Sequence, residues 1–309
     1  MDKFNVELAA TIGRVKLKNP VLVAAGTFGY GEEYAKYVDL NKLGGLIAKT
    51  ITLKPRKGNP PPRLTETPAG LLNSIGLENS GIDSFIEKNL PFLHNLKTAL
   101  IVSIAGENEE DYLRLADRLG KEKCIHALEV NVSCPNVNSG SKMIGEEPEL
   151  VFSLTRRLKE VSGLPFFIKL SAQIGRMVEL SQAAREAGAE AVSLINSIPA
   201  MAIDVDKMCP KLGNVVGGLS GPAIRAIAVK IVWEVHSKVD IPIIGMGGIM
   251  SLEDALEFVL AGASAVAVGT ANFIDPQVSL KIIDELEHYL YEKKIRSFSE
   301  LVGKLKTGG

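Results

Sequence analysis

The feature that most constrains the fold is a repeated alternation of short apolar segments with amphipathic ones. Eight apolar segments have the length of strands, and apolar residues recur at helical spacing in several of the stretches between them. Nearly continuous apolar strands are typical of a parallel sheet covered on both faces. The predicted strands are Val21–Ala24, Leu46–Ala48, Leu100–Ile104, Leu128–Val132, Phe166–Leu170, Ala191–Leu194, Ile241–Ile244 and Ala265–Val268. The predicted helices include Glu109–Leu119, Glu149–Val161, Val178–Ala187, Pro222–Lys238 and Leu252–Leu260.

Eight βα units after an N-terminal hairpin predict an α/β fold, a (β/α)8 TIM barrel. The hairpin is predicted within residues 5–19, where apolar residues alternate on both sides of a turn at Gly13. The chain has 309 residues and no linker, so we expect a single domain over residues 1–309. A doubly wound sheet is the alternative, because periodicity does not show whether the sheet closes.

Composition and charge limit the binding partners and the cellular location that we expect. The net charge is −1 and charges of both signs are interspersed, so no nucleic acid or anionic membrane surface is expected as a partner. No apolar run approaches the ~20 residues that span a bilayer, and the N-terminal residues do not resemble a signal peptide. The 3 cysteines argue against a disulfide framework and for a reducing compartment. We therefore expect a cytoplasmic protein.

Two connections are longer than the usual few residues. One runs from Thr50 to about Ile82 and the other from Asn196 to about Gly221. Both follow the C-terminal ends of predicted strands, the face on which barrel enzymes build their active sites. Long connections in a compact domain are usually functional or disordered. We predict that they form a lid over a substrate.

Glycine-rich turns follow the last two predicted strands, at Gly245-Met246-Gly247-Gly248 and at Gly269-Thr270. Backbone N–H groups of such turns can bind a phosphate, and the two turns together predict a phosphate site. For either turn alone, a tight βα connection is an equally good interpretation. The first turn lacks a full dinucleotide fingerprint and comes at the seventh strand, so no NAD site of the Rossmann type is expected.

Lys49 and Lys169 follow or end predicted barrel strands. A lysine there needs a counter-charge, and it suits a substrate carboxylate or a reduced cofactor ring that carries negative charge. The alternatives are that both side chains reach solvent, or that Lys169 forms a Schiff base with a sugar phosphate, as in an aldolase.

Four asparagines lie at strand ends or in adjoining loops: Asn73, Asn131, Asn136 and Asn196. A side-chain amide both donates and accepts hydrogen bonds. The set would complement a ring that alternates N–H and C=O groups, such as a pyrimidine or another cyclic ureide. Any one of them alone is more often a turn or cap residue.

Cys134 follows the fourth predicted strand, beside Pro135 and between two of these asparagines. A thiol there can act as a general base or a nucleophile if its surroundings favour the thiolate, whereas an isolated cysteine is more often a small buried hydrophobe. Cys124 and Cys209 lack such surroundings and are interpreted as structural. His94, His126, His236 and His288 lie outside the predicted mouth of the barrel, and no Cys-x-x-Cys pair exists, so no metal or iron–sulfur site is expected.

Taken together, the motifs resemble those of class 1 dihydroorotate dehydrogenases, from the hairpin to the last helix. They are Asn131-Val132-Ser133-Cys134-Pro135-Asn136, Asn73-Ser74-Ile75-Gly76-Leu77, Gly217-Gly218-Leu219-Ser220-Gly221-Pro222 and Gly245-Met246-Gly247-Gly248-Ile249. Residues 25–29 and 212–218 look most like the catalytic subunit of class 1B. The membrane-associated class has an N-terminal extension and a serine in place of Cys134.

The resemblance implies an FMN enzyme that oxidises (S)-dihydroorotate to orotate in pyrimidine synthesis. It implies that Cys134 is the base that takes the C5 proton while a hydride leaves C6 for flavin N5, and that Lys169 faces the N1/O2 edge of the flavin. The implied substrate residues are Lys49, Asn73, Ser74, Ile75, Gly76, Leu77, Asn131, Asn136, Asn196 and Ser197. The other implied FMN residues are Ala25, Lys49, Thr50, Ser103, Asn131, Ile195, Gly221, Gly247, Gly248, Gly269 and Thr270.

The chain departs from the family pattern at Ala25, where serine is frequent, at Ser103, where asparagine is frequent, and at Ser197, where threonine is common. Class 1B implies a homodimer core and a second subunit that carries FAD and a 2Fe–2S cluster and reduces NAD⁺, giving a heterotetramer. A single-chain class 1A enzyme that uses fumarate is the alternative within the family. A flavin-binding subunit without catalysis is a further one.

Overall fold

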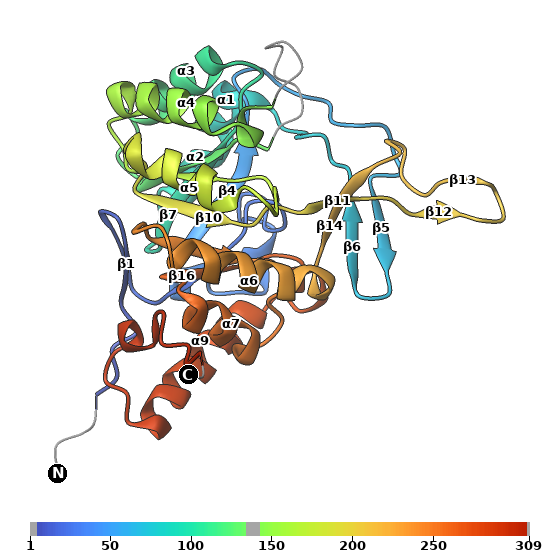
Figure 1. Cartoon of the computed structure of the whole chain (residues 1–309). Helices are drawn as coiled ribbons and strands as arrows, with labels where there is room; N and C mark the ends of the chain where they lie inside the picture. The colour runs from blue at the N-terminus through green and yellow to red at the C-terminus, as the bar shows by residue number, and fades with distance from the viewer. Residues whose placement is uncertain (1–4, 134–142, 308–309) are drawn as a thin grey trace.

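The computed structural model describes residues 5–133 and 143–307 of the chain. Eight parallel strands close into a barrel in chain order, with the last strand beside the first (Figure 1). Closure confirms the predicted TIM barrel and rules out the doubly wound sheet. The strands are β3 (Val21–Val23), β4 (Gly45–Ile51), β7 (Ala99–Ile104), β8 (Ala127–Asn131), β9 (Phe166–Lys169), β10 (Ala191–Leu194), β15 (Ile243–Met246) and β16 (Ala265–Val268).

The predicted start of the seventh strand was wrong by two residues. Strand β15 begins at Ile243 because Pro242 has no N–H to donate to a neighbouring strand; its carbonyl oxygen still accepts from the N–H of Val192 (3.0 Å). Gly245 and Met246, assigned to the turn from sequence, therefore belong to the strand. Strand β4 is also longer than predicted, and includes Lys49 and Thr50.

Helices surround the barrel, and their apolar faces pack on the strands. Asn108 caps α3 by accepting from the N–H of Asp111 (3.1 Å), and Ser251 caps α7 in the same way. The principal helices are α3 (Glu109–Leu119), α4 (Pro148–Val161), α5 (Met177–Glu186), α6 (Arg225–His236), α7 (Leu252–Ala261) and α9 (Val278–Lys293). The predicted helix 222–238 is shorter, since residues 222–224 form the 3₁₀ turn η5.

Shorter helical elements fill the remaining connections. They are η1 (Tyr34–Lys36), η2 (Leu40–Lys42), α1 (Gly81–Ser84), the π-helical turn η3 (Phe85–Asn89), α2 (Leu90–Leu93), η4 (Ile144–Glu146), α8 (Ala271–Ile274) and η6 (Phe298–Leu301).

The predicted N-terminal hairpin is present as β1 (Ala10–Ile12) and β2 (Val15–Leu17). Its inward residues Ile12 and Val15 are buried, and Arg14 forms an ion pair with Glu190 (2.6 Å). Glu190 directly precedes β10. The hairpin therefore lies at the N-terminal ends of the barrel strands, away from the predicted site.

The two long connections, predicted to form a lid over a substrate, contribute strands to one antiparallel sheet. The first supplies β5 (Leu64–Thr67) and β6 (Gly70–Asn73), and the second supplies β11 (Ile198–Ala200) and β14 (Gly217–Ser220). They leave the barrel after β4 and β10, which stand four places apart in the ring of eight. The sheet therefore joins segments from opposite walls of the barrel.

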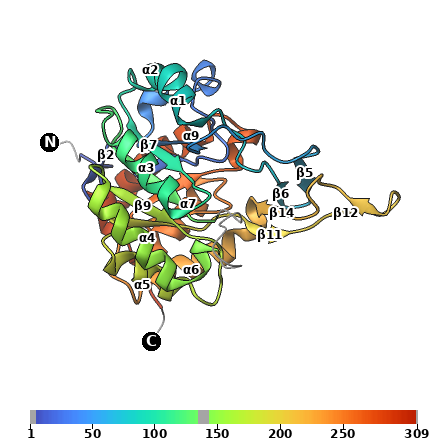
Figure 2. The same cartoon turned by 90° about the horizontal axis from the view of Figure 1, so that it is seen from above.

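A two-stranded ribbon, β12 (Ile203–Asp204) and β13 (Cys209–Pro210), extends outward beyond this sheet (Figure 2). It carries exposed apolar side chains, among them Val205 and Met208.

Candidate functional site

Three adjacent strands carry polar residues in the same layer, near the C-terminal end of the barrel. Asn131 on β8 is in register with Lys169 on β9, which is in register with Ser193 on β10. The side chain of Lys169 is buried, and its Nζ forms an ion pair with Oε1 of Glu129 (3.5 Å). Lys169 therefore places its charge inside the barrel instead of extending to solvent.

The ends of β8 and β10 bring two predicted asparagines together. Asn196 donates from Nδ2 to Oδ1 of Asn131 (3.3 Å), and the same oxygen accepts from the N–H of Ser133 (3.2 Å). Asn196 in turn accepts at Oδ1 from the N–H of Ser197 (2.8 Å). The phenol of Tyr112 holds the backbone here by donating to the carbonyl oxygen of Asn131 (2.9 Å). These amides are thus fixed by one another.

Asn73 reaches the same region from β6. It donates from Nδ2 to the carbonyl oxygen of Gly218 (3.2 Å). A side chain on Gly218 would collide with Ser197, so glycine is what lets β14 approach both predicted substrate residues. The sheet that links the long connections therefore brings Asn73 and Ser197 to one place.

The segment after Asn73 is held in shape by Arg63. Its guanidinium donates to the carbonyl oxygens of Asn59 (2.5 Å) and Lys57 (2.8 Å) and pairs with Glu78 (2.5 Å). Ser74 accepts at Oγ from Nδ2 of Asn59 (2.9 Å). The predicted substrate residues Ile75, Gly76 and Leu77 lie within this clamped segment, and Gly76 and Leu77 both have positive φ (72° and 56°).

Lys49 lies near the end of β4 and is partly buried. Burial lowers the pKa of Lys49, while the nearby carboxylates of Glu78 and Glu33 raise it and Arg63 lowers it further. Its electrostatic neighbours therefore include both members of the Arg63–Glu78 pair. Lys49 is thus within electrostatic range of the clamped segment, in line with a residue that shares a substrate with it.

Three glycine turns meet where the phosphate was predicted. A Cβ on Gly248 would lie 2.7 Å from the carbonyl oxygen of Gly221, and one on Gly221 would lie 3.5 Å from Cγ2 of Thr270. Gly221 and Gly248 have φ of 90° and 82°, values that disfavour any side chain. Thr270 also donates to Oγ of Ser220 (2.8 Å). The remaining predicted members, Gly247 and Gly269, belong to the same turns.

Residues predicted to line a flavin lie on four strands or just beyond them. Thr50 on β4 and Ser103 on β7 share a hydrogen bond between their hydroxyls (2.9 Å). Ile195, just after β10, donates from its N–H to the carbonyl oxygen of Met246 (3.0 Å), and Ala25 is buried after β3. Beside Ala25, a Cβ on Gly26 would meet nothing within 4 Å. There is thus space beside Ala25 and Gly26 for a bound group.

The predicted base Cys134 and the predicted substrate residue Asn136 lie outside the described residues. The chain enters that segment at Ser133, directly after the Asn131 network, and leaves it at Met143, before η4. Gly145 in η4 donates from its N–H to the carbonyl oxygen of Val132 (3.2 Å). The two ends of the segment are therefore both anchored beside the end of β8.

Several residues of this region were not identified from sequence. Arg63 and Tyr112 position the predicted residues, and Glu129 is the partner of Lys169. The hydroxyls of Ser171 and Ser193 are buried without a hydrogen-bond partner among the described residues. A signal existed for Glu129, because it is the one charged residue within the predicted strand Leu128–Val132.

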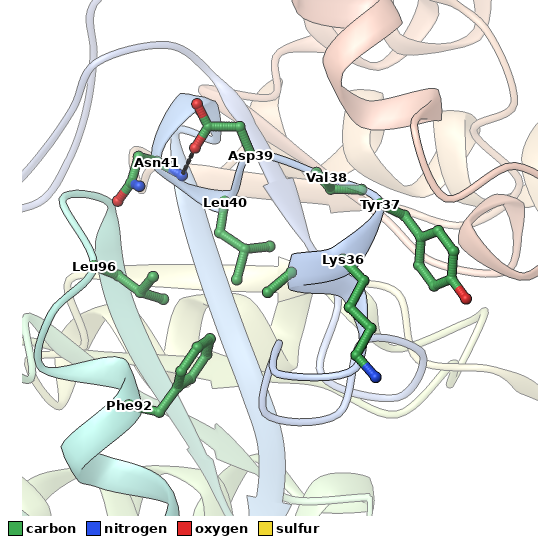
Figure 3. A pocket seen from close by; sticks show the side chains of 9 residues that line it. Lys36, Tyr37, Val38, Asp39, Leu40, Asn41, Phe92 and Leu96 are labelled. Carbon is green, nitrogen blue, oxygen red and sulfur yellow. Dashed lines mark hydrogen bonds between the residues drawn. The ribbon is translucent and has the colours of Figure 1, made fainter.

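Two surface hollows lie away from this region. One of about 470 Å³ is formed by residues 35–41 with Phe92 and Leu96, and Asp39 there accepts from the N–H of Asn41 (Figure 3). A second of about 450 Å³ is formed by residues 236–242 and Ser264. Both include residues that lead into the N-terminal ends of barrel strands. The predicted site residues belong to neither.

Residues 7–290 match the family model for dihydroorotate dehydrogenase. The chain belongs to the dihydroorotate dehydrogenase family. Among curated relatives, it is 52% identical over 305 residues to a protein of Desulforudis audaxviator named dihydroorotate dehydrogenase B (NAD(+)), catalytic subunit, with 98% of this chain and 99% of the relative covered. A protein of the same name from Thermoanaerobacter sp. is 48% identical, with 98% of this chain and 100% of the relative covered. Another from Geobacter metallireducens is 49% identical, with 97% of this chain and 99% of the relative covered.

The same fold is found in a solved structure. A dihydroorotate dehydrogenase of Eimeria tenella, crystallised in complex with ferulenol, superposes with a TM-score of 0.79 at 22% identity, over 98% of this chain and 90% of the other. At that identity the likeness concerns the barrel architecture. Dihydroorotate dehydrogenases are flavin-dependent, and the name of the curated relatives describes a catalytic subunit, which implies a partner subunit for those proteins.

Two further observations concern the described residues alone. In the ranges 5–133 and 143–307, no three His, Cys, Asp or Glu side chains are grouped so that they could hold a metal ion. No helix in those ranges is long and apolar enough to span a membrane. The histidines are in helices or connections: His94 follows α2, His126 precedes β8, His236 ends α6 and His288 is in α9.

Proposed function

We propose that this protein oxidises (S)-dihydroorotate to orotate in pyrimidine synthesis, with FMN as its bound cofactor. The observation that carries the proposal is the match of nearly the whole chain to relatives named as catalytic subunits of dihydroorotate dehydrogenase. The geometry supports it, because the Asn131–Asn196 pair, Asn73, Ser197 and Lys49 are predicted substrate residues on elements at one end of the barrel.

The residues present fit FMN. The turns at Gly221, Gly248 and Thr270 converge and would hold the phosphate, and the buried ammonium of Lys169 would face the electron-rich edge of the ring. Space beside Gly26 and unpartnered hydroxyls such as Ser193 are consistent with a group bound between these walls.

In the proposed reaction, Lys49 and the asparagines bind and orient the substrate. Cys134 takes the proton from C5 of the substrate, and the amides fix the ring so that this proton faces the thiolate. FMN, when bound, would supply the acceptor for the hydride, two electrons with their proton, that leaves C6. Burial of Lys169 and its neighbours excludes water from the interior side of the site.

The proposal extends to a partner subunit. The relatives' name contains NAD(+), which supports transfer of electrons to NAD⁺ through a second subunit, proposed to carry FAD and a 2Fe–2S cluster in a heterotetramer around a homodimer. Use of fumarate by the single chain is the alternative. The proposed location is the cytoplasm, in line with the free thiols of Cys124 and Cys209.

The proposed function predicts a yellow protein whose flavin absorbance bleaches when dihydroorotate is added without oxygen. Acid release and chromatography would identify the flavin as FMN. Copurification with a flavin and iron–sulfur subunit, and orotate formation with NAD⁺ but not fumarate, would support the partner. A colourless protein that takes up no added FMN would contradict the proposal.

The predicted phosphate site gives a second test. Gly248→Ala would place a side chain at φ 82° and 2.7 Å from the carbonyl oxygen of Gly221, so the turns must separate. Backbone strain of this kind costs about 1–3 kcal/mol, and we expect FMN affinity to fall by about tenfold or more. Fluorescence titration of the apoprotein with FMN measures this. Gly163→Ala is the matched control, because its nearest neighbour would be 3.9 Å away, between α4 and β9; equal loss in both variants would argue against a phosphate site.

The aldolase alternative is disfavoured by one observation. Lys169 forms an ion pair with Glu129, a contact that favours an ammonium, whereas a Schiff base needs the free amine to attack a carbonyl. Borohydride trapping with a sugar phosphate would test this, and a covalent adduct on Lys169 would support the alternative.

A further inference from the structure

Glu129 is a carboxylate inside the barrel. It lies in the middle of β8, between the buried residues Leu128 and Val130, and its side chain is 0% exposed. A carboxylate in such a place is costly unless a cation and hydrogen bonds compensate for the lost water. Barrel interiors are ordinarily filled by branched apolar residues at this level. The position therefore needs an explanation that packing does not give.

Lys169 supplies the compensating charge. Its Nζ lies 3.5 Å from Oε1 of Glu129, and its side chain is 10% exposed. The register partner of Lys169 on β8 is Asn131, two residues closer to the C-terminal end than Glu129. The carboxylate thus contacts the ammonium from the interior side, below the level of the candidate site.

Other charged or titratable groups do not share this role among the described residues. The register neighbours of Lys169, Asn131 and Ser193, are uncharged. The charged neighbours of Lys49 are Glu78, Arg63 and Glu33, which are not in β7–β10. Oε2 of Glu129 has no hydrogen-bond partner among the described residues. Glu129 is therefore bound to the site through Lys169 alone.

We propose that Glu129 is a positioning residue that holds the ammonium of Lys169 against the flavin ring. This inference rests on the proposed function. An ammonium has three N–H donors, so contact with one carboxylate from below leaves donors for a group above. Without that contact, the flexible four-carbon side chain of lysine can turn away from the ring.

The proposal fixes the sign of an effect on the flavin. Removing a nearby negative charge would, by itself, make a reduced, anionic flavin more stable. Losing the position of Lys169 would make it less stable, because the cation that faces it is no longer in place. We expect the second effect to dominate, which separates an anchor for Lys169 from a carboxylate that is merely nearby.

The experiment measures the two-electron reduction equilibrium of bound FMN in Glu129→Gln against a reference dye. We expect a shift of about tenfold toward the oxidised form, which corresponds to about 30 mV for a two-electron couple. The shift toward the oxidised form should be lost when Glu129→Gln is introduced into Lys169→Met, because the anchored group is gone; only the direct effect of the missing negative charge remains, which favours the reduced form. That double variant removes both charges and keeps the measurement possible if the single variant folds poorly.

Glu190→Gln is the matched control. Glu190 is also a carboxylate at the barrel with a cationic partner, Arg14, but at the other end; its side chain is 12% exposed. The Glu190→Gln variant is expected to lower thermal stability without changing the reduction equilibrium of the flavin. An unchanged or more easily reduced flavin in Glu129→Gln would overturn the inference, as would the same shift in the Lys169→Met background. If the parent protein binds no flavin, both the proposed function and this inference fail. If it binds flavin but the reduction equilibrium does not change in Glu129→Gln, only the positioning role is refuted.

Discussion

Replacing Cys134 by serine is expected to slow flavin reduction by dihydroorotate about 10²- to 10⁴-fold, the range of a lost general base. Serine keeps the size and a polar atom, but its hydroxyl ionises far less readily than a thiol. Binding of substrate should change little, because the Asn131 network and Asn73 remain. Anaerobic stopped-flow measurement of flavin bleaching separates the two quantities.

The pH profile adds a second criterion for Cys134. Flavin reduction in the parent protein should accelerate as the thiol ionises, and that rise should be missing in the serine variant within the accessible range. Cys209→Ser is the matched control, since Cys209 is exposed in the outlying ribbon. Burial raises the pKa of Cys124, which makes it a poor base near neutrality. A parent rate that is flat from mildly acidic to alkaline pH would refute the assignment.

Lys49→Met should lower kcat/KM for dihydroorotate by about 10²-fold, or about 2.7 kcal/mol, as expected for a lost charged hydrogen bond to the substrate. Methionine retains most of the aliphatic volume, so β4 should stay packed. Steady-state kinetics with a dye acceptor would measure the loss. Lys18→Met is the control, because Lys18 donates to the carbonyl oxygens of Asn41 and Lys97 far from the site; a similar loss there would indicate a general effect of destabilisation.

The lowered pKa of Lys49 predicts a pH effect with a defined sign. As pH rises through that pKa, the ammonium becomes neutral and its attraction for the substrate carboxylate disappears. KM should therefore begin to rise at a pH below that of an ordinary exposed lysine, and in Lys49→Met it should be flat over that interval. A parent KM that follows the titration of an exposed lysine would contradict burial as the cause.

The barrel could be predicted from sequence because its strands are buried on both faces and its helices have one apolar face. Strands β10 and β16 and helix α3 were predicted with their observed ends. The error at β15 has a local cause, Pro242, which could have been recognised. Family membership, predicted from the motifs around Cys134, Asn73 and Gly248, is confirmed by the match over residues 7–290.

The antiparallel sheet formed by the two long connections could not be predicted in the same way. Strand β6 pairs with β14, and the hydrogen bond from Asn73 to Gly218 spans 145 residues. Neither segment has a sequence pattern that identifies the strand it pairs with. Pairing between segments so far apart in sequence depends on where the barrel positions the two connections. The pairing of Glu129 with Lys169 was missed for a different reason: the barrel made their strands neighbours, but the register that brings the two side chains into contact is not readable from either segment.

The sheet that joins β5 and β6 to β11 and β14 has a consequence for how the protein matures on the ribosome. Its first hairpin is synthesised early, but the strand it must pair with follows about 145 residues later, a wait of about 7–30 s at ordinary rates of translation. Closure of the barrel itself waits for β16. A truncated or stalled chain would therefore contain Asn73 without strand β14, against which Asn73 is positioned. The ability to bind substrate should appear abruptly, late in synthesis.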